Sequence, residues 1–464
     1  MTTSYIHSFQ SGIRRPIDRC LFTRDLPLQT LEHIYNAVWS TVGYGVISFL
    51  RNRTAEDTLF WRGRLGHYEY PPMTTGSPRI WFHAVSVGEV AGAVPTIHAL
   101  RRRLPRAALF LTTGTPQGFR FAMDQLPREV FVFPFPLDLP AVLNKAFQAL
   151  NPDLYVAMES EFWPNLFRIL RERQIPSLLL NGRLSQRSAR RYALFKPLFL
   201  PVFQQFRFLA MLSETDRQNV IQLGAPPERV AVLGSSKYDG LPLRARPGSA
   251  DTWRTLLDIP QHLPVVVGGS LRRSECIGIL EAFQSLLRQE PETVGIFAPR
   301  HLHRIPEMAQ WLEKEGIPHQ LLTDIEKGRE KRRASAVLVD RIGILFELYS
   351  LGDLIFCGGT LEPIGGHNIL EPAAWKKPVF YGPSLQKVID EHNILHSLGG
   401  SFPVRSTEDL LHQWTYWIQH RQELKAHGDK AGEALQRLTG AADRQAALIL
   451  DTLSERQKGT EHRP

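Results

Sequence analysis

The feature that most constrains the fold of this chain is a repeated alternation of short apolar runs with helix-like segments. The runs that we predict as strands in the first half are 79–85, 107–112, 130–135, 154–158, 176–180, 208–212 and 230–233. A second series follows at 264–268, 293–298, 319–322, 336–339, 354–357 and 378–381. Because short connections join each run to a helix-like segment, the pattern predicts parallel sheets with helices on both faces.

The chain is too long for one ordinary core, since 464 residues suit two domains. A stretch rich in Pro and Gly between Asp239 and Ser249 separates the two strand series and predicts an interdomain linker. We therefore expect an α/β protein with two doubly wound, Rossmann-like domains facing a cleft, and ligands at the carboxyl ends of the strands. The expected segments are a basic leader and helix over 1–53, a first domain over 54–240, a linker over 241–251, and a second domain with a helical tail over 252–464.

The charge balance restricts the class of partner. A formal net charge of +9 and a pI near 9.5 favour an acidic partner, which is a nucleic acid, an anionic membrane face or a phosphorylated substrate. A merely Arg-rich surface of a soluble protein is the alternative. Three cysteines without disulfide or zinc spacing favour a reducing compartment.

An uncharged apolar segment lies near the N-terminus. Residues 33–50 read HIYNAVWSTVGYGVISFL, without Asp, Glu, Lys or Arg, and Arg51 follows at once. This length is near the lower limit for crossing a bilayer, and Tyr35, Trp39 and Tyr44 suit a membrane interface. The segment predicts a hydrophobic anchor helix, either single-pass or interfacial, and the alternative is a buried or partner-docking helix.

Two acidic motifs follow predicted strands of the first domain. In HAVSVGE, Ser86 and Gly88 precede Glu89, which lies in a first helical turn where the helix dipole favours a carboxylate. In ESEFWPN, Glu159 and Glu161 are two residues apart, so an extended chain would point both to one face. Two adjacent carboxylates are costly without a cation or a chemical task. Support of the helix dipole and a solvated acidic turn are the alternatives.

Basic and polar residues close the same domain. Asn181 and Arg183 end one predicted strand and lead into an Arg-rich helix, which suits a phosphate-bearing acceptor or an anionic membrane as well as a solvated face. Lys237 lies at the end of the domain, where we expect it to face the cleft.

The second domain carries three segments that point to an anion. Ser270 lies in a glycine-rich loop without the ending of a P-loop, and Arg300 and His301 follow a strand. In GGHNILEP, Gly365 and Gly366 free the backbone, whereas His367 and Asn368 are predicted to begin a helix whose N–H groups hold a phosphate. Glu371 would accept hydrogen bonds from ribose. The glycine pair, His367, Asn368 and Glu371 together predict a nucleotide site. His301 and His303 have no third ligand nearby, and no Asp-x-Asp pair occurs in the sequence, so we expect no metal.

The motifs HAVSVGE, ESEFWPN, NGRLS, APRH and GGHNILEP occur in this order between Trp81 and Pro383. Together they resemble the Kdo transferases, the 3-deoxy-D-manno-octulosonic acid transferases of lipopolysaccharide synthesis. The resemblance implies a GT-B fold with an N-terminal acceptor-binding domain and a C-terminal domain that binds a CMP-sugar. It also implies CMP-Kdo as donor, a lipid A precursor as acceptor, and inversion of the anomeric centre without a metal or cofactor. The partners would include the anionic cytoplasmic face of the inner membrane but no nucleic acid.

The resemblance also assigns roles to residues by position. Glu89 corresponds to the catalytic base, and Glu161 and Lys237 to residues that support the transition state. The nucleotide contacts would be Pro299, Arg300, Ile342, Gly343, Ile344, Asn368, Ile369, Leu370 and Glu371. The further donor or acceptor contacts would be Ser86, Gly88, Glu159, Asn181, Arg183, Ser270, His301, Gly365, Gly366 and His367.

The chain departs from the family pattern in several places, and two of them lie at or next to residues of the expected site. Ile344 stands where the family usually has Glu, and Ser235 stands where it usually has Asn. The alternatives to a Kdo transferase are another GT-B nucleotide-sugar transferase or epimerase, and an inactive membrane-bound homologue.

Overall fold

The structure, a computed structural model, describes residues 28–50, 55–68 and 76–461. Contacts divide the chain into two units: unit 1 comprises residues 1–93, 100–234 and 447–464, and unit 2 comprises residues 94–99 and 235–446. The domains expected from the sequence place residues 235–240 in the first domain and the whole helical tail in the second. The contact division instead groups residues 235–240 with unit 2 and residues 447–464 with unit 1.

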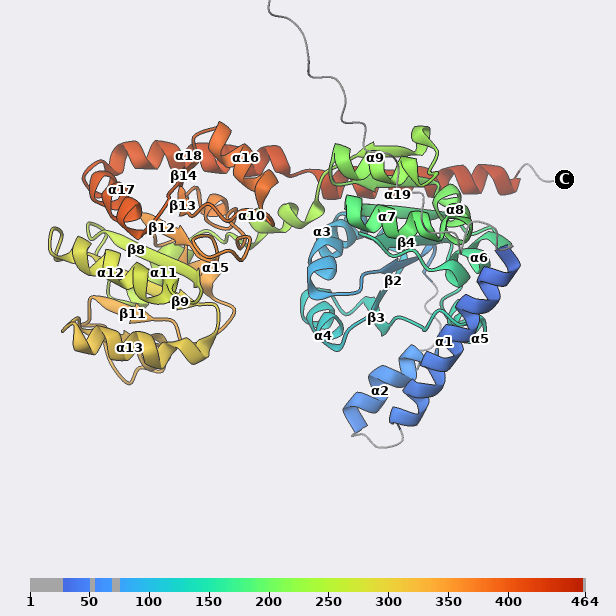
Figure 1. The fold of residues 1–464 in the computed structure, drawn as a ribbon, viewed down its shortest axis with the longest axis horizontal. Helices are drawn as coiled ribbons and strands as arrows, with labels where there is room; N and C mark the ends of the chain where they lie inside the picture. The colour runs from blue at the N-terminus through green and yellow to red at the C-terminus, as the bar shows by residue number, and fades with distance from the viewer. Residues whose placement is uncertain (1–27, 51–54, 69–75, 462–464) are drawn as a thin grey trace, which may run out of the picture. The chain divides into compact units, whose positions relative to one another are not determined.

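Unit 1 is built on a parallel sheet of seven strands, as the alternating pattern predicted (Figure 1). Its strands are β1 (Arg79–His83), β2 (Ala108–Thr113), β3 (Val130–Pro134), β4 (Leu154–Met158), β5 (Ser177–Gly182), β6 (Phe208–Met211) and β7 (Val230–Val232). Their order across the sheet is β3-β2-β1-β4-β5-β6-β7. The chain moves outward in one direction from β1 and in the other direction from β4, so these two neighbours form the switch point where open α/β sheets bind ligands.

Helices cover both faces of this sheet, and their starts follow local sequence rules (Figure 1). Side-chain caps begin α3, α4, α7 and α9, and Pro occupies the first turn of α4, α5, α6 and α8. The helices are α2 (Ala55–Arg64), α3 (Val87–Arg103), α4 (Pro116–Gln125), α5 (Pro140–Leu150), α6 (Pro164–Glu172), α7 (Gln186–Leu194), α8 (Lys196–Gln205) and α9 (Glu214–Gln222). Their apolar faces and the sheet bury a core that includes Trp81, Phe147 and Phe167.

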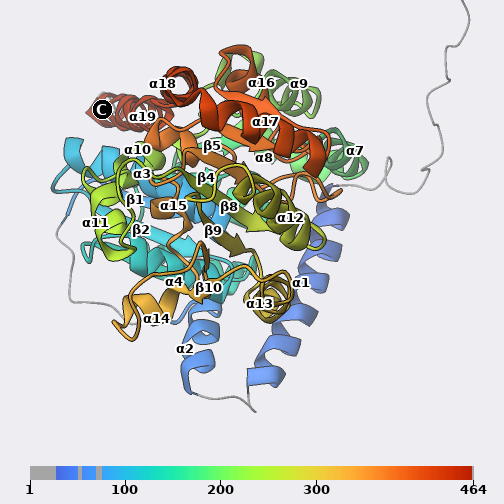
Figure 2. The same ribbon diagram turned by 90° about the vertical axis from the view of Figure 1, so that its left-hand side faces the viewer.

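The predicted N-terminal helix is present as α1 (Leu28–Leu50), which lies beside α2 in both views (Figures 1 and 2). In the described part of the chain, no helix is both long enough and apolar enough to cross a membrane. Of the two kinds of anchor that the sequence left open, this finding does not support the single-pass one. One side of α1 packs against the rest of unit 1. The Tyr35 hydroxyl donates to Asp138 at 2.7 Å, and the ring centroids of Trp39 and Trp163 are 5.5 Å apart. The leader over 1–27 and Arg51 lie outside the described residues.

Unit 2 contains a second parallel sheet of seven strands, in the order β10-β11-β9-β8-β12-β13-β14. Its strands are β8 (Val265–Leu271), β9 (Val294–Pro299), β10 (His319–Leu321), β11 (Ala336–Leu338), β12 (Leu354–Cys357), β13 (Val379–Tyr381) and β14 (Ser401–Pro403). The switch point of this sheet lies between β8 and β12. The sequence reading missed β14, because three residues with one large apolar side chain give no strand periodicity.

The helices of unit 2 include the helical tail that was predicted from the sequence. They are α10 (Gly240–Arg244), α11 (Ser249–Leu256), α12 (Glu275–Leu287), α13 (Ile305–Lys314), α14 (Leu322–Glu326), α15 (Leu345–Leu348), α16 (Ile389–Ser397), α17 (Thr407–Gln419), α18 (Arg421–Leu438) and the first residues of α19 (Ala441–Glu461). Two of them, α10 and α11, occupy most of the stretch that was predicted as a linker.

Candidate functional site

Glu89 lies in the first turn of α3, directly after the carboxyl end of β1 at the switch point of unit 1. The Ser86 side chain caps α3 and accepts from the Glu89 N–H at 3.5 Å. In return, Glu89 Oε2 accepts from the Val85 N–H at 2.8 Å and Oε1 accepts from the Ser86 hydroxyl at 3.3 Å. This reciprocal arrangement is close to a capping box, so helix capping accounts for the position of the carboxylate.

Capping does not account for the protonation of Glu89. Burial raises the pKa of its carboxyl to about 8, and the nearby charges of Glu161 and Glu159 add to the rise, whereas the Val85 N–H and the Ser86 hydroxyl oppose it. A carboxyl that titrates near neutral pH is suited to exchange a proton with a bound molecule. Glu89 therefore combines a structural role with the properties of a general acid or base.

Glu161 lies after β4, on the other side of the same switch point. Its Oε2 accepts from the Trp163 indole N–H at 2.7 Å and is 3.3 Å from Nε2 of the buried His83. His83 itself is fixed by its Nδ1, which is 3.0 Å from the Thr112 carbonyl oxygen, on the neighbouring strand β2. The sequence reading quoted His83 within its motif but gave it no role, because a buried imidazole is not distinguishable from a core residue without its neighbours.

The two glutamates of ESEFWPN do not lie in the geometry that was predicted for them. Glu159 has a left-handed backbone with φ of 55°, and its carbonyl accepts from the Arg183 N–H at 3.1 Å. The chain therefore turns after Met158 instead of extending, and the alternation argument for one shared face is wrong. Both carboxylates nevertheless act on Glu89, so the structure brings the three acids together by a different route.

The remaining predicted contacts of unit 1 follow the same edge of the sheet. Asn181 is buried at the end of β5, and Arg183 is exposed just beyond it. Next along the chain, Arg187, Arg190 and Arg191 are exposed on α7. Gly88 is exposed, and a Cβ there would meet only the Ser86 hydroxyl oxygen, at 3.8 Å.

In unit 2, the carboxylate of Glu275 organises the loops at the switch point. Glu275 begins α12 and is buried, and its two oxygens accept from the amides of Gly359, Thr360 and Leu361 at 2.6 to 2.9 Å. The Arg272 N–H also donates to Glu275 Oε2, at 3.0 Å. One side chain thereby ties the loop after β8 to the loop after β12. The sequence reading assigned Glu275 no role, although an acid at a helix start after a glycine-rich strand was a usable signal.

The GGHN loop is held by its glycines and not by a helix. Gly365 and Gly366 have φ of 97° and 89°, and their amides donate to Ser384 Oγ and the Gly359 carbonyl at 2.9 Å and 2.8 Å. The prediction that His367 and Asn368 begin a phosphate-holding helix is wrong. Asn368 Oδ1 instead accepts from the Leu370 N–H, and the only helical residues that follow closely are the short 3-10 turn Pro372–Trp375.

Positive groups converge on this loop. The pKa of His367 is lowered to about 4, first by burial and then by the charges of Arg272, Arg300 and Lys387, with a smaller contribution from His301. The His367 Nε2 is buried and has no hydrogen-bond partner among the described residues. A neutral imidazole and three cations form an environment that favours an anion with hydrogen-bonding oxygens.

Glu371 lies among basic side chains of the same unit. Burial raises the pKa of its carboxyl, while the charges of Arg244 and Lys237 and a hydrogen bond from Asn368 lower it. Lys237 is exposed in the 3-10 turn Ser236–Asp239 and groups with unit 2. The charge of Lys237 therefore acts on Glu371.

The other predicted nucleotide contacts lie in the loops after β9 and β11. Pro299 ends β9, and Arg300 follows it and is exposed. Ile342 is 78% exposed and Gly343 has φ of 99°, whereas Ile344 is buried in the core of unit 2. Ser270 has a left-handed backbone with φ of 54° at the end of β8. Ile369 and Leu370 are buried, so these two can offer a ligand their backbone but little side-chain surface.

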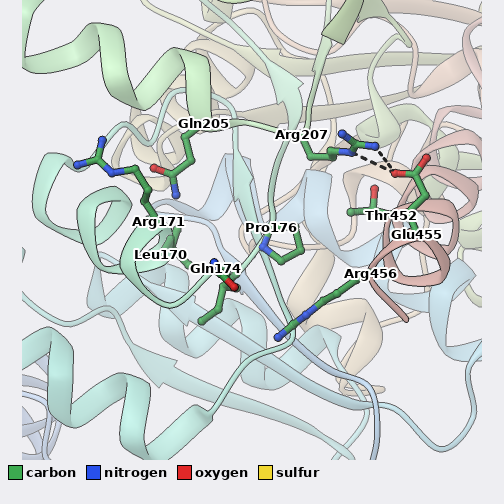
Figure 3. A pocket seen from close by; sticks show the side chains of 10 residues that line it. Leu170, Arg171, Gln174, Pro176, Gln205, Arg207, Thr452, Glu455 and Arg456 are labelled. Atoms are coloured by element: carbon green, nitrogen blue, oxygen red, sulfur yellow. Dashed lines mark hydrogen bonds and ion pairs between the residues drawn. The ribbon is translucent and has the colours of Figure 1, made fainter. Parts of the chain in front are cut away.

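A cavity of about 350 Å³ lies away from these loops, at the amino ends of β5 and β6 (Figure 3). Arg171, Arg207 and Arg456 line it, and Arg207 is paired with Glu455. It contains none of the predicted site residues, and open α/β sheets bind ligands at the opposite edge.

Acidic and histidine side chains do not form a metal site in the described ranges. There, no group of three or more His, Cys, Asp or Glu side chains could hold a metal ion.

The chain is similar to a set of transferases along most of its length. The sequence model of the family described as 3-deoxy-D-manno-octulosonic-acid transferase (kdotransferase) matches residues 60–240. A 3-deoxy-D-manno-octulosonic acid transferase of Haemophilus influenzae is 31% identical over 86% of this chain and 91% of its own length. A probable mitochondrial 3-deoxy-D-manno-octulosonic acid transferase of Arabidopsis thaliana is 33% identical over 71% of this chain and 73% of its own length.

Solved structures bear on the fold. The UDP-GlcNAc 2-epimerase of Neisseria meningitidis, bound to UDP-GlcNAc, matches 81% of this chain and 99% of its own with a TM-score of 0.56 and 13% identity. At this identity the match concerns the fold alone, and it agrees with the two parallel sheets in assigning the GT-B class.

Glu275 provides a test of how the loops of unit 2 are held. We expect Glu275→Ala to leave three buried amides without their acceptor, at about 1–3 kcal/mol for each unsatisfied group. Hydrogen exchange at Gly359, Thr360 and Leu361, followed by mass spectrometry, should become at least about tenfold faster. Glu281→Ala, an exposed change on the same helix, is the matched control. Equal exchange in both variants would contradict the organising role of Glu275.

Proposed function

Because the chain belongs to the 3-deoxy-D-manno-octulosonic acid (Kdo) transferase family and is therefore a glycosyltransferase, we propose that it transfers Kdo from CMP-Kdo to a lipid A precursor. The observation that supports this most is the half-buried carboxyl of Glu89, whose pKa is raised to about 8 at the switch point of unit 1. An attack by a sugar hydroxyl requires a base with these properties.

In the proposed reaction, the Glu89 carboxylate removes the proton of the acceptor hydroxyl. The hydroxyl oxygen then forms a bond to the anomeric carbon of Kdo, while the bond from that carbon to the phosphate oxygen of CMP breaks. CMP leaves with the electron pair, and attack on the face opposite to it inverts the anomeric centre. Burial and the neighbouring charges of Glu161 and Glu159 favour the protonated Glu89 that results.

The departing CMP gains negative charge, for which unit 2 supplies the counterpart. Arg272, Arg300 and Lys387 surround the GGHN loop, and the unpartnered Nε2 of His367 offers a further polar contact. Preorganised positive groups of this kind stabilise charge that develops in the transition state. In our proposal this loop holds the phosphate of CMP, and Glu371 accepts from the ribose.

The acceptor side of the proposal combines exposed arginines with α1. Arg183 and the three arginines of α7 provide cations for the anionic groups of a lipid acceptor. On α1, Ile34 and Val38 are 51% and 58% exposed and are four residues apart, so they share one face. We place the enzyme at the anionic cytoplasmic face of the inner membrane, with this face of α1 in the interface.

The direct test of the proposed function is a transfer assay. The full chain is incubated with CMP-Kdo and a tetra-acylated lipid A precursor, and the lipid is analysed by mass spectrometry. We expect a mass increase equal to one or more Kdo residues, inhibited by CMP but not by UDP. Inhibition by UDP alone, with transfer from a UDP-sugar, would replace the proposal with a different GT-B transferase or an epimerase. Binding of both partners without any product would indicate an inactive homologue.

Glu89 gives the proposed reaction a defined pH dependence. A base works only when deprotonated, so kcat/KM should rise as pH increases through about 8, the raised pKa of Glu89. Glu89→Gln should reduce turnover by about 10²-fold or more without weakening CMP binding measured by calorimetry. The control is Glu214→Gln, an exposed acid of the same unit. Turnover retained in Glu89→Gln, with the same pH profile, would refute the assignment.

The interfacial placement of α1 is tested separately by vesicle sedimentation. The double variant Ile34→Asp/Val38→Asp removes two apolar side chains, each contributing about 1.5–3 kcal/mol when buried in the lipid. Binding to vesicles of phosphatidylglycerol and phosphatidylcholine should weaken by at least about tenfold. Leu243→Asp, at a residue of unit 2 that is 68% exposed, should bind as the unmodified protein does. Equal loss in the two variants would show that the effect is not specific to α1.

A further inference from the structure

Helix α1 packs on the segment that carries Glu161, residues 161–166. The rings of Trp39 on α1 and Trp163 meet edge to face, with centroids 5.5 Å apart. The Trp163 ring also packs against the buried Phe135, at 5.7 Å. Its indole N–H donates to Glu161 Oε2 at 2.7 Å. One indole therefore connects a ring of α1 to a carboxylate at the switch point of unit 1.

Two polar contacts join α1 to the end of the same segment, where α6 begins. Asp138 is fully buried, and its carboxylate accepts from the amides of Asn165 and Leu166 at 3.1 Å and 2.9 Å. The Tyr35 hydroxyl donates to the same carboxylate at 2.7 Å. The Asn165 side-chain amide donates to Asn36 Oδ1 at 2.5 Å. Because a buried carboxylate is costly without its donors, the Tyr35 contact ties α1 to the first turn of α6.

These contacts come from one face of α1. Tyr35 and Trp39 are four residues apart, and their ring centroids are separated by 6.2 Å. The exposed Ile34 and Val38, which we place in the membrane interface, lie on a different face of the helix. An interfacial helix needs its apolar face and makes no use of an indole and a hydroxyl directed at residues 161–166. Membrane binding therefore does not account for the docked face.

Glu161 is the side chain that depends most on how this segment is held. Its carboxylate is 12% exposed, and Oε2 lies 3.3 Å from Nε2 of the buried His83. The Trp163 indole contacts the same oxygen from the segment itself. Residues 161–163 belong to no helix or strand, so side-chain contacts have to fix their backbone. A group that acts in a reaction must be held to within about 0.5 Å.

We propose that α1 is a positioning element of the strand edge with the three acids, where Trp39 acts through Trp163 to hold the Glu161 carboxylate in place. This inference rests on the proposed function, because the proposed reaction takes place at that edge. The residues of α1 contact no reacting group in this account. They act through the segment 161–166, which makes Trp39 a positioning residue.

Hydrogen exchange in the full chain tests the docking and needs no enzymatic activity. Trp39→Ala removes one ring of the aromatic pair, and Tyr35→Phe removes the donor to Asp138 without changing either tryptophan. In both variants the backbone amides of residues 161–166 should exchange at least about threefold faster, as followed by mass spectrometry. Unchanged exchange in both variants would overturn the inference whether or not the chain transfers Kdo.

Two further variants show whether the docked face is responsible. Trp39→Phe keeps an aromatic ring, so exchange at residues 161–166 should return to within about twofold of the unmodified protein. Thr41→Ala is the matched control on α1, because Thr41 is exposed and its hydroxyl donates to the Ala37 carbonyl of the same helix at 2.9 Å. An equal increase in Thr41→Ala would overturn the role of the docked face.

Kinetics tests the consequence for the reaction. The lipid acceptor is dispersed in detergent, so that binding to a bilayer does not limit the rate. In Trp39→Ala, kcat should fall by at least about tenfold, because a displaced carboxylate no longer meets the reacting groups. The KM for CMP-Kdo should stay unchanged, since the proposed nucleotide contacts lie in unit 2. Trp39→Phe should recover kcat to within about twofold, and Thr41→Ala should turn over as the unmodified protein does.

The two measurements separate this inference from the proposed function. Faster exchange in Trp39→Ala, with no transfer by the unmodified protein, would contradict the proposed function and still support the hold of α1 on residues 161–166. An unchanged kcat in an active Trp39→Ala enzyme would overturn the inference alone. If Trp39→Ala does not fold, Tyr35→Phe, which lacks a single oxygen atom, decides by the same exchange and kcat measurements.

Discussion

The central constraint on unit 1 is electrostatic. Glu89, Glu159 and Glu161 lie at one partly buried edge of the sheet, where ionising all three carboxyls costs free energy. Like charges in such a site disfavour ionisation, and each carboxylate needs donors or a proton. The chain meets this need with the Val85 N–H, the Ser86 hydroxyl, the Trp163 indole and the buried His83. These donors do not offset the full cost of ionising Glu89, and its pKa therefore rises to about 8. Burial is the main cause of this rise, and repulsion by Glu161 and Glu159 adds to it, so Glu89 acquires the pKa that the proposed base needs.

Unit 2 has the same type of parallel sheet but gathers positive instead of negative side chains at its switch point. Its switch point gathers Arg272, Arg300 and Lys387 around a loop whose amides are arranged by one buried acid, Glu275. The hydrogen bonds that Glu275 accepts come from backbone amides, so this acid fixes the loops next to the cations. Each parallel sheet therefore positions its charged loops by strand order, unit 1 with acidic side chains and unit 2 with basic ones. This distribution fits our proposal of a transferase that deprotonates an acceptor and releases CMP.

Sequence alone predicted the parts of this account that depend on local pattern. The run 154–158 is confirmed residue for residue as β4, because five consecutive apolar residues bounded by turns have few alternatives. The helix at His367 was predicted wrongly, since two left-handed glycines and an Asn turn outweighed the helical composition that follows. The sequence predicted that Glu159 and Glu161 share one face of an extended strand. The chain turns at Glu159 instead, although both carboxylates still act on Glu89. The side-chain contacts of His83 and Glu275 are made with residues 78 and 84 or more positions away in the chain, which no local pattern reveals.

The measurement that tests the central claim most directly is a crystal structure of the enzyme with CMP and an unreactive analogue of the lipid acceptor. The account predicts that a Glu89 carboxylate oxygen lies within about 3 Å of the attacking hydroxyl, and that the CMP phosphate contacts Arg300 and the GGHN loop. An acceptor hydroxyl that is bound to a different carboxylate, with Glu89 retained entirely in its helix cap, would contradict it.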